Sequence, residues 1–382
     1  MSFLLEGITA VTWQQAVMYV VGIILIWLAV KKEYEPSLLL PLGFGAILVN
    51  LPYSGVVDQM VQGKIPAAGI IEWLFKTGIE ASEAMPILLF IGIGAMIDFG
   101  PLLSQPVLFL FGAAAQFGIF AAILIACLMG FDLRDAASIG IIGAADGPTS
   151  ILVSQVLGSR YIGPIAVAAY SYMALVPIIQ PFAIRLVTTR KERCIHMEYN
   201  PKSVNKQLRI AFPIAVTIIV GLISPQSVAL VGFLMFGNLL RECGVLGSLS
   251  QTAQNEFANI ITLLLGITIS FSMRAEQFVN PATLMIMVLG LVAFVFDTIG
   301  GVLFAKLVNV FLKMAGKKPV NPMIGGCGIS AFPMSSRVVQ KMAAREEPGN
   351  IILMQAAGTN VSGQVASVIA GGLVISIVSQ YL

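Results

Sequence analysis

Residues 139–155 place oxygen-bearing side chains in the middle of an apolar stretch. A carboxylate, Asp146, precedes the helix-breaking pair Gly147-Pro148, and the hydroxyls of Thr149 and Ser150 follow it. A carboxylate at the centre of a bilayer costs about 2.5–3.5 kcal/mol on insertion scales unless it has a partner. Carboxylate, hydroxyl and carbonyl oxygens are the ligands that small hard cations prefer in proteins. We therefore interpret this segment as a cation site.

The same segment cannot be one continuous helix. Pro148 has no N–H, so a helix through it would leave the carbonyl of Ala144 unpaired. Broken backbone at membrane depth is tolerated only where protein or a wet cavity surrounds it. We expect the freed peptide oxygen to lie beside Asp146. The plainer alternative is a structural carboxylate that caps a helix or pairs with a lysine, but the adjacent apolar run contains no basic residue.

A degenerate second copy of this segment lies at 321–340. Four residues recur at a constant offset of 185: Gly143, Pro148, Ser150 and Gln155 match Gly328, Pro333, Ser335 and Gln340. The mismatches are informative, because Asp146 aligns with Ala331 whereas Arg337 aligns with Leu152. One copy supplies an anion and the other a cation, so we expect a polar, asymmetric pocket between them. Two broken segments at corresponding positions of two halves point to the binding site of a transporter.

Composition restricts the class of protein that positions these groups. The chain has 382 residues, of which 57% are hydrophobic and 11% are charged, whereas soluble domains carry about 25% charged residues. The net charge of +3 is too small and too scattered to suggest a nucleic-acid partner. The four cysteines form no Cys-x-x-Cys, which excludes a disulfide framework and a typical zinc site. The single histidine, His196, lies in a polar loop, so histidine-based catalysis inside the membrane is excluded.

The pattern of apolar stretches predicts an all-α polytopic membrane protein with about ten to twelve membrane segments. The first stretch follows Glu6 and no basic region, so we expect a retained span rather than a cleaved signal peptide. Residues 66–79 are amphipathic enough for an interfacial or half-length helix. Residues 185–209 form a long polar connection with seven basic residues, which the positive-inside bias places in the cytoplasm.

This basic connection divides the chain into two membrane repeats, 1–184 with the broken segment 139–155 and 210–382 with the broken segment 321–340. We expect two internal repeats and two broken helices in an elevator-like transporter architecture. In such a protein one bundle moves between two positions against a scaffold.

Three motifs carry a resemblance to a known family. Residues 143–150, 321–341 and 355–363 resemble the beta subunit of sodium-translocating, biotin-dependent decarboxylases, which act on oxaloacetate, methylmalonyl-CoA or glutaconyl-CoA. The resemblance implies a pump that removes CO2 from carboxybiotin, takes up a proton and exports Na+. The compact chain is more similar to the members that serve CoA esters.

The resemblance also implies roles for individual residues. Na+ would bind to Asp146, Asn321, Asn360 and Ser330, and carboxybiotin to Arg337, Ser330 and Gly325. Tyr172 would be the partner of Asp146 in proton supply, which makes Asp146, Tyr172 and Arg337 the catalytic group. The alternatives are interhelical hydrogen bonds for the asparagines, a snorkelling helix end for Arg337 and an interfacial anchor for Tyr172. Asp297, a second carboxylate within a span, could bind a cation, but we favour a structural role for it.

The resemblance implies partners as well. The chain contains no biotinylation sequence of the Ala-Met-Lys-Met kind, so carboxybiotin would arrive on a separate biotin carrier subunit. A carboxyltransferase alpha subunit, a small single-span membrane subunit and a homo-oligomer, by resemblance a trimer, are expected in a bacterial cytoplasmic (inner) membrane. The basic connection 185–209 could also dock an acidic carrier domain. The alternative function is a stand-alone Na+-coupled secondary transporter, in which Arg337 binds the carboxylate of an organic anion.

Overall fold

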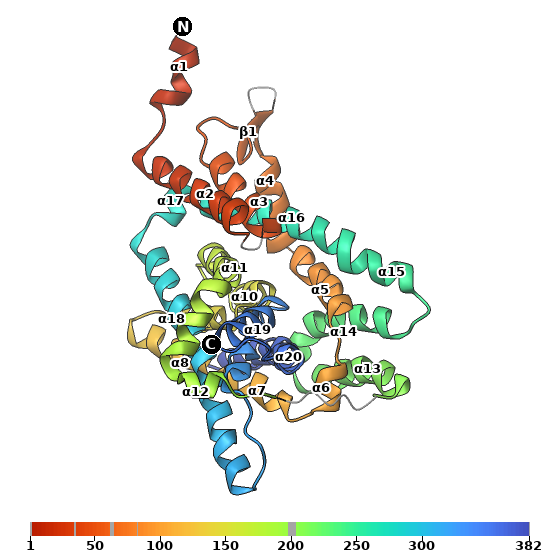
Figure 1. Ribbon diagram of the computed structural model, residues 1–382. Coiled ribbons are helices and arrows are strands. Elements are labelled where there is room, and N and C mark those ends of the chain that lie inside the picture. The colour runs from red at the N-terminus through yellow and green to blue at the C-terminus, as the bar shows by residue number, and fades with distance from the viewer. Residues whose placement is uncertain (1, 34–35, 62–64, 82, 198–203, 382) are drawn as a thin grey trace.

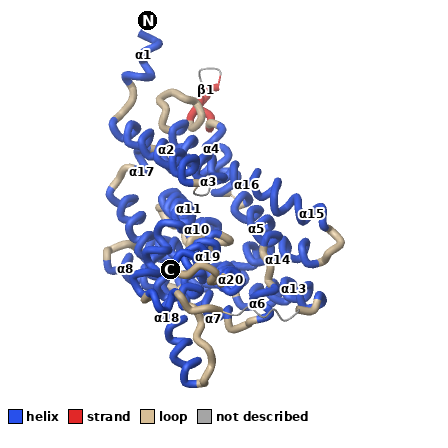
Figure 2. The backbone as a smooth tube through the Cα atoms, viewed as in Figure 1, coloured by secondary structure: helices blue, strands red, loops and turns tan. Residues whose placement is uncertain are grey.

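The computed structural model describes residues 2–33, 36–61, 65–81, 83–197 and 204–381 of the chain, and most of them are helical (Figures 1 and 2). The α-helices are α1 (Ser2–Thr9), α2 (Trp13–Lys32), α3 (Pro36–Val49), α4 (Ile70–Phe75), α5 (Ala84–Met96), α6 (Gly100–Ser104), α7 (Leu108–Ala115), α8 (Phe117–Leu128), α9 (Leu133–Gly140), α10 (Gly147–Val156), α11 (Ile162–Val187), α12 (Arg190–Arg193), α13 (Lys206–Ile223), α14 (Val228–Glu242), α15 (Gly247–Thr252), α16 (Ala258–Ile269), α17 (Ala275–Phe278), α18 (Pro281–Met314), α19 (Met334–Glu346) and α20 (Leu353–Val378). Four 3-10 helices are η2 (Ile141–Ala144), η3 (Pro225–Ser227), η5 (Ser270–Met273) and η6 (Pro322–Gly328), and two π-helices are η1 (Lys76–Glu80) and η4 (Ala253–Phe257).

Seven helical stretches of the described residues are long and apolar enough to cross a membrane, which confirms a polytopic membrane protein. They are Trp13–Lys32, Leu108–Leu128, Ile162–Val187, Lys206–Ile223, Gly247–Met273, Pro281–Met314 and Leu353–Val378. A bent pair, Ile70–Glu80 with Ala84–Met96, makes an eighth if it counts as one span. A total of ten to twelve segments would also include α3 and the broken segments, and stays a prediction.

Burial differs sharply between these spans and identifies the centre of the molecule. Only 11% of the apolar window of α13 is buried and 17% of that of α2, against 72% for α20. α20 contacts α7, η6, α19 and α10, and it lies in the middle of Figure 1. Buried amides and hydroxyls line it: Gln355, Thr359, Asn360, Ser362, Gln364 and Ser367. A span with so many polar groups needs protein on all sides, because lipid offers no hydrogen-bond partners.

The prediction of one helix over 66–79 is wrong. Strand β1 (Asp58–Val61) pairs antiparallel with β2 (Ile65–Ala68), and the helix begins only at Ile70. Pro66 sits in β2 of this two-stranded sheet, where its missing N–H is tolerated because the strand has a free edge. This hairpin is the exception to an all-α fold (Figure 2).

The structure confirms that both proline-containing segments are broken helices. In the first, η2 ends at Ala144 and α10 begins at Gly147, with Ala145 in the left-handed region at φ 52° and Asp146 extended. In the second, η6 ends at Gly328 and α19 begins at Met334. Each segment is therefore a 3-10 helix, a break and an α-helix. The internal repeat and the elevator-like movement remain predictions.

Candidate functional site

Asp146 occupies the N-terminal end of α10 and is almost completely buried. Its Oδ2 accepts a hydrogen bond from the hydroxyl of Thr149 at 2.7 Å, and its Oδ1 lies 3.5 Å from the backbone nitrogen of Thr149. The carboxylate thus caps α10, and the positive end of the helix favours its charge. Asp146 therefore does cap a helix, as the structural alternative predicts, but the cap accounts for only part of the contacts of its carboxylate.

Three further side chains reach the same carboxylate oxygen from the second half of the chain. The hydroxyls of Ser330 and Ser367 lie 3.2 and 3.1 Å from Asp146 Oδ2, and Nε2 of Gln364 lies 3.5 Å away. The two serine hydroxyls are 3.0 Å apart. A hydroxyl can turn to present either a proton or a lone pair. The group can therefore solvate a bare carboxylate, and it can also present several oxygens to a cation.

No ion pair of Asp146 with a basic side chain occurs within the described ranges. The oxygens around it come from three hydroxyls and the carboxylate itself, and Gln364 contributes an amide nitrogen as donor. Such a set is chemically suited to a hard monovalent cation, and it contains none of the nitrogen or sulfur ligands that select transition metals.

The expected free carbonyl beside Asp146 is not found. The oxygen of Ala144 accepts a hydrogen bond at 2.9 Å from the backbone N–H of Ser330. The proline does free this oxygen from its own helix, but the second broken segment supplies the missing donor. The two breaks are thereby joined directly, through backbone at Ala144 and through side chains at Asp146.

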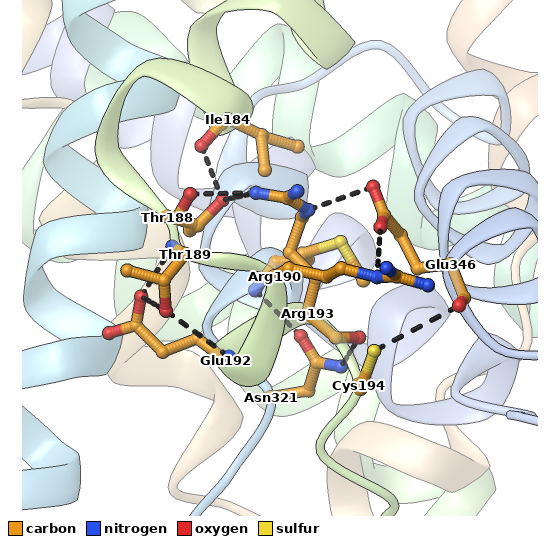
Figure 3. A network of polar contacts seen from close by, with 10 residues as sticks. Ile184, Thr188, Thr189, Arg190, Glu192, Arg193, Cys194, Asn321 and Glu346 are labelled. Atoms are coloured by element: carbon orange, nitrogen blue, oxygen red, sulfur yellow. Dashed lines mark hydrogen bonds and ion pairs between the residues drawn. The ribbon is translucent and has the colours of Figure 1, made fainter.

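Asn321 does not join this group. It caps the start of η6, where its amide nitrogen donates to the carbonyl of Arg193 at 2.8 Å (Figure 3). The same nitrogen donates to the carbonyl of Ile195 at 2.9 Å. Its side-chain oxygen accepts from the backbone N–H of Met323. Seven residues of 3-10 helix, about 14 Å, separate this cap from the end of η6 near Ser330.

Asn360 lies closer to the site without touching the carboxylate. Its amide nitrogen donates to the carbonyls of Cys327 at 3.2 Å and Ile329 at 2.8 Å, which brackets the end of η6. On α20 it precedes Ser367 by two helical turns, about 10 Å. Its buried Oδ1 has no hydrogen-bond partner in the described part of the chain. Asn360 therefore holds the backbone that presents Ser330.

The three residues expected to bind carboxybiotin are not brought together. Gly325 packs against α18 so closely that a Cβ there would lie 2.1 Å from the carbonyl oxygen of Gly301. Arg337 is exposed on α19, whereas Ser330 belongs to the buried group around Asp146. Arg337 and Asp146 therefore do not lie together in the single chain, and a polar, asymmetric pocket between the two halves stays a prediction.

Two tyrosines of α11 differ in their relation to Asp146. The hydroxyl of Tyr172, the expected partner, donates to the carbonyl of Met287 on α18, and its ring packs near Gly290. Tyr170 instead lies over Gly147, the residue after Asp146. Sequence reasoning missed Tyr170, and it also missed Gln364 and Ser367. The spacing of Asn360, Gln364 and Ser367, which is that of one helix face, was the available signal.

Asp297 is fully buried in α18, and its Oδ2 has no hydrogen-bond partner in the described part of the chain. Its Oδ1 accepts a hydrogen bond at 3.1 Å from the backbone N–H of Ile119, in the first turn of α8. The carboxylate thus caps the helix that resumes after the break at Gln116.

The basic connection 185–209 is attached to the second broken segment at the end of α19. Arg193 pairs with Glu346 at 3.0 Å, and both side chains are mostly buried, at 13% and 14% exposed (Figure 3). Arg193 also donates to the carbonyl of Thr188. Part of the positive charge of 185–209 is therefore used inside the protein, while Arg190 and Lys191 stay exposed. The segment 198–203 of this connection lies outside the described residues.

Comparison with known proteins agrees with this chemistry. A profile of the family described as "Na+-transporting oxaloacetate decarboxylase beta subunit" matches residues 14–378. The chain is 46% identical to the methylmalonyl-CoA decarboxylase subunit beta of Propionigenium modestum, over 94% of each chain. It is 45% identical to the glutaconyl-CoA decarboxylase subunit beta of Acidaminococcus fermentans, over 98% of this chain and 96% of that one. With the oxaloacetate decarboxylase beta chain of Klebsiella pneumoniae the identity is 41%, over 95% of each. The chain therefore belongs to the beta subunits of sodium-translocating, biotin-dependent decarboxylases.

Proposed function

We propose that this chain is the subunit that decarboxylates carboxybiotin, takes up a proton and exports Na+ across the bacterial cytoplasmic membrane. The observation that carries the proposal is the environment of Asp146. A buried carboxylate, without an ion pair in the described ranges, is surrounded by hydroxyls from both broken segments and from α20. A bare charge at this depth is destabilising, so the group needs a cation or a proton as its partner.

Competition between Na+ and a proton for one carboxylate provides the coupling. Carboxybiotin loses CO2 and takes up one proton, which leaves biotin. When Na+ binds at Asp146, it displaces the proton of this carboxyl group. The released proton is the one that the decarboxylation of carboxybiotin takes up. Moving one charge against 100 mV requires about 2.3 kcal/mol, so one decarboxylation can export only a few ions.

The hydrogen bond between Ser330 and Ala144 favours joint movement of the two broken segments. If one broken segment moves alone, this hydrogen bond and the contacts to Asp146 are strained. They are kept if the two segments move together. In our proposal both breaks move as one body against the outer spans, and the cation faces each side of the membrane in turn.

In this proposal the first ligands of Na+ are the carboxylate of Asp146 and the hydroxyls of Thr149, Ser330 and Ser367. Asn321 and Asn360 do not bind the ion directly, and instead hold the two ends of η6 through hydrogen bonds to the backbone. Direct ligation by Asn360 through its unpartnered oxygen would require η6 or α20 to shift.

Arg337 contributes from the surface of α19 in our proposal. Arg337, Lys341 and Arg345 recur every four residues on the exposed face of this helix. The helix ends at Glu346, where it pairs with the cytoplasmic connection, and Arg337 lies nine residues, about 13 Å, before that end. An exposed arginine at such depth needs a wet cavity or a neighbouring subunit. The row forms a basic track along which an anionic carboxybiotin can approach from the cytoplasm.

We further propose that the complex serves a CoA ester. The relatives that are named for CoA esters are 45–46% identical to this chain, against 39–41% for those named for oxaloacetate. The expected partners are a biotin carrier subunit, a carboxyltransferase alpha subunit, a small single-span membrane subunit and further copies of this chain in a trimer. The carboxyltransferase selects the acid.

The deciding experiment measures CO2 release from free carboxybiotin by the purified chain with its membrane partners, with and without Na+. Release that depends on Na+ supports the pump, and its absence contradicts it. The alternative, a stand-alone Na+-coupled carrier of an organic anion, predicts transport by the chain alone and no inhibition by avidin. A pump subunit should purify with a biotinylated partner.

A further inference from the structure

Tyr170 is a buried phenol whose hydroxyl has no internal partner. The residue is fully buried in α11, and its hydroxyl oxygen makes no hydrogen bond within the described part of the chain. A buried hydroxyl without a partner is destabilising, and such a group in a native structure calls for a functional explanation. Two residues later, Tyr172 is different, because its hydroxyl donates to the carbonyl of Met287.

The ring of Tyr170 lies directly against the start of α10. A Cβ at Gly147 would lie 2.2 Å from Cζ of Tyr170, 2.4 Å from Cε1 and 2.5 Å from Cε2. The carbon that carries the hydroxyl is therefore the ring atom nearest to that point. Only a glycine at position 147 allows this approach.

The approach brings the phenol against the residue that directly follows Asp146 in the chain. The unpartnered oxygen and the oxygen-rich group of Asp146, Thr149, Ser330 and Ser367 thus occupy one region of the protein interior.

We propose that the phenol oxygen of Tyr170 is a further ligand of the cation at Asp146, which rests on the function proposed above. A neutral phenol offers lone pairs to a cation without adding a negative charge. Its ring is confined by Gly147 and by complete burial, so the oxygen is positioned before the ion arrives. The ligand set then has five oxygen-bearing side chains, contributed by α10, the second break, α11 and α20.

The test compares Tyr170→Phe with the control variant Tyr161→Phe in the purified complex, because Tyr161 is a partly exposed tyrosine directly before α11. We measure the Na+ concentration that gives half-maximal decarboxylation and the rise in melting temperature that Na+ produces. Tyr170→Phe should raise the half-maximal Na+ concentration about tenfold, as the loss of one polar contact typically does. It should reduce the Na+-induced rise in melting temperature, because binding stabilises the folded state in proportion to affinity. Tyr161→Phe should keep the wild-type half-maximal concentration.

Stability without Na+ distinguishes a ligand from a structural hydroxyl. Removing an oxygen that has no internal partner should leave the melting temperature in Na+-free buffer unchanged or higher. An equal fall of the melting temperature with and without Na+ would reveal an internal partner and would overturn the proposal. An unchanged Na+ dependence in Tyr170→Phe would also overturn it. The ratio of Li+ to Na+ affinity adds a readout that a structural role would not move, and we expect it to change in Tyr170→Phe.

Asp146→Asn separates this inference from the function on which it rests. If Asp146→Asn loses the Na+ response and Tyr170→Phe keeps it, only the role of Tyr170 is wrong. If Asp146→Asn itself keeps the Na+ response, the proposed cation site is wrong.

Discussion

The two broken segments have the same sequence of elements but different surroundings. In the first, every residue of α10 from Gly147 to Ser154 is buried, and Asp146 takes donors from three residues of two other parts of the chain, the second break and α20. In the second, α19 keeps an exposed basic face, and both ends are tied to the basic connection 185–209 through Asn321 and Glu346. The comparison suggests that the first segment holds the ion and that the second links the ion to the cytoplasmic surface.

The largest expected effect concerns the acid of the first segment. Asp146→Asn keeps the size of the side chain but removes the charge, so Na+ loses its only anionic ligand in the described group. We expect Na+-dependent decarboxylation to fall at least a hundredfold, about 3 kcal/mol, while the protein still inserts into the membrane. The rate of CO2 release as a function of Na+ concentration checks this.

Asp132→Asn provides the control for this variant, because Asp132 is an exposed carboxylate in the turn before α9. It should behave as wild type. A normal Na+ response of Asp146→Asn would remove the functional difference between the two broken segments.

The second expected effect concerns the hydroxyls that the second half contributes. Ser330→Ala and Ser367→Ala each remove one oxygen from the group at Asp146, and each should weaken Na+ affinity about tenfold. Because the two hydroxyls also contact each other at 3.0 Å, the double variant should deviate from the sum of the single effects. Na+ titration of the decarboxylation rate gives the three values.

Ser336→Ala is the matched control from the same segment, because its hydroxyl donates to the carbonyl of Pro333 and to no group at Asp146. It should leave Na+ affinity unchanged. Equal effects of all three serines would mean that the substitutions act on the packing of α19 rather than on the ion.

The third prediction concerns the anchor of the second segment. Glu346→Gln leaves the mostly buried guanidinium of Arg193 without its anion, so the free energy of unfolding should fall by about 1–3 kcal/mol. Glu347→Gln, which breaks the exposed pair with His196, should cost less than about 0.5 kcal/mol. Melting temperatures of the two purified variants make the comparison, and similar values would show that this anchor does not stabilise the second segment.

Much of the fold follows from local features of the sequence. Hydropathy predicts the apolar spans, seven of which are helices long enough to cross a membrane in the described residues. The breaks follow from Pro148 and Pro333, because a missing N–H acts on the helix that contains it. The hairpin was missed since Pro66 and Gly69 had been interpreted inside a helix, although both residues commonly end one.

The site is only partly predictable, because its members are brought together by tertiary packing. Asp146 stands out by itself, as an acid in an apolar run. Ser367 and Tyr170 become part of its surroundings only through the packing of α20 and α11, which the sequence does not specify. Asn321 matches a family motif equally well whether it binds an ion or caps a helix, and here its amide caps η6.

The smallest expected effect tests the exposed basic face of α19. Lys341→Gln combined with Arg345→Gln removes two charges from the outer part of the proposed track and leaves Arg337 in place. If this face guides an anionic substrate, kcat/KM for carboxybiotin should fall about three- to fivefold at low ionic strength. The difference should shrink at about 0.5 M salt, where screening reduces interactions between exposed charges. Na+ affinity should not change, because these side chains lie away from Asp146 on the exposed face. A fall in kcat/KM that persists at high salt would mean that the two residues support the packing of α19, and the second segment would then have no guiding role at the surface.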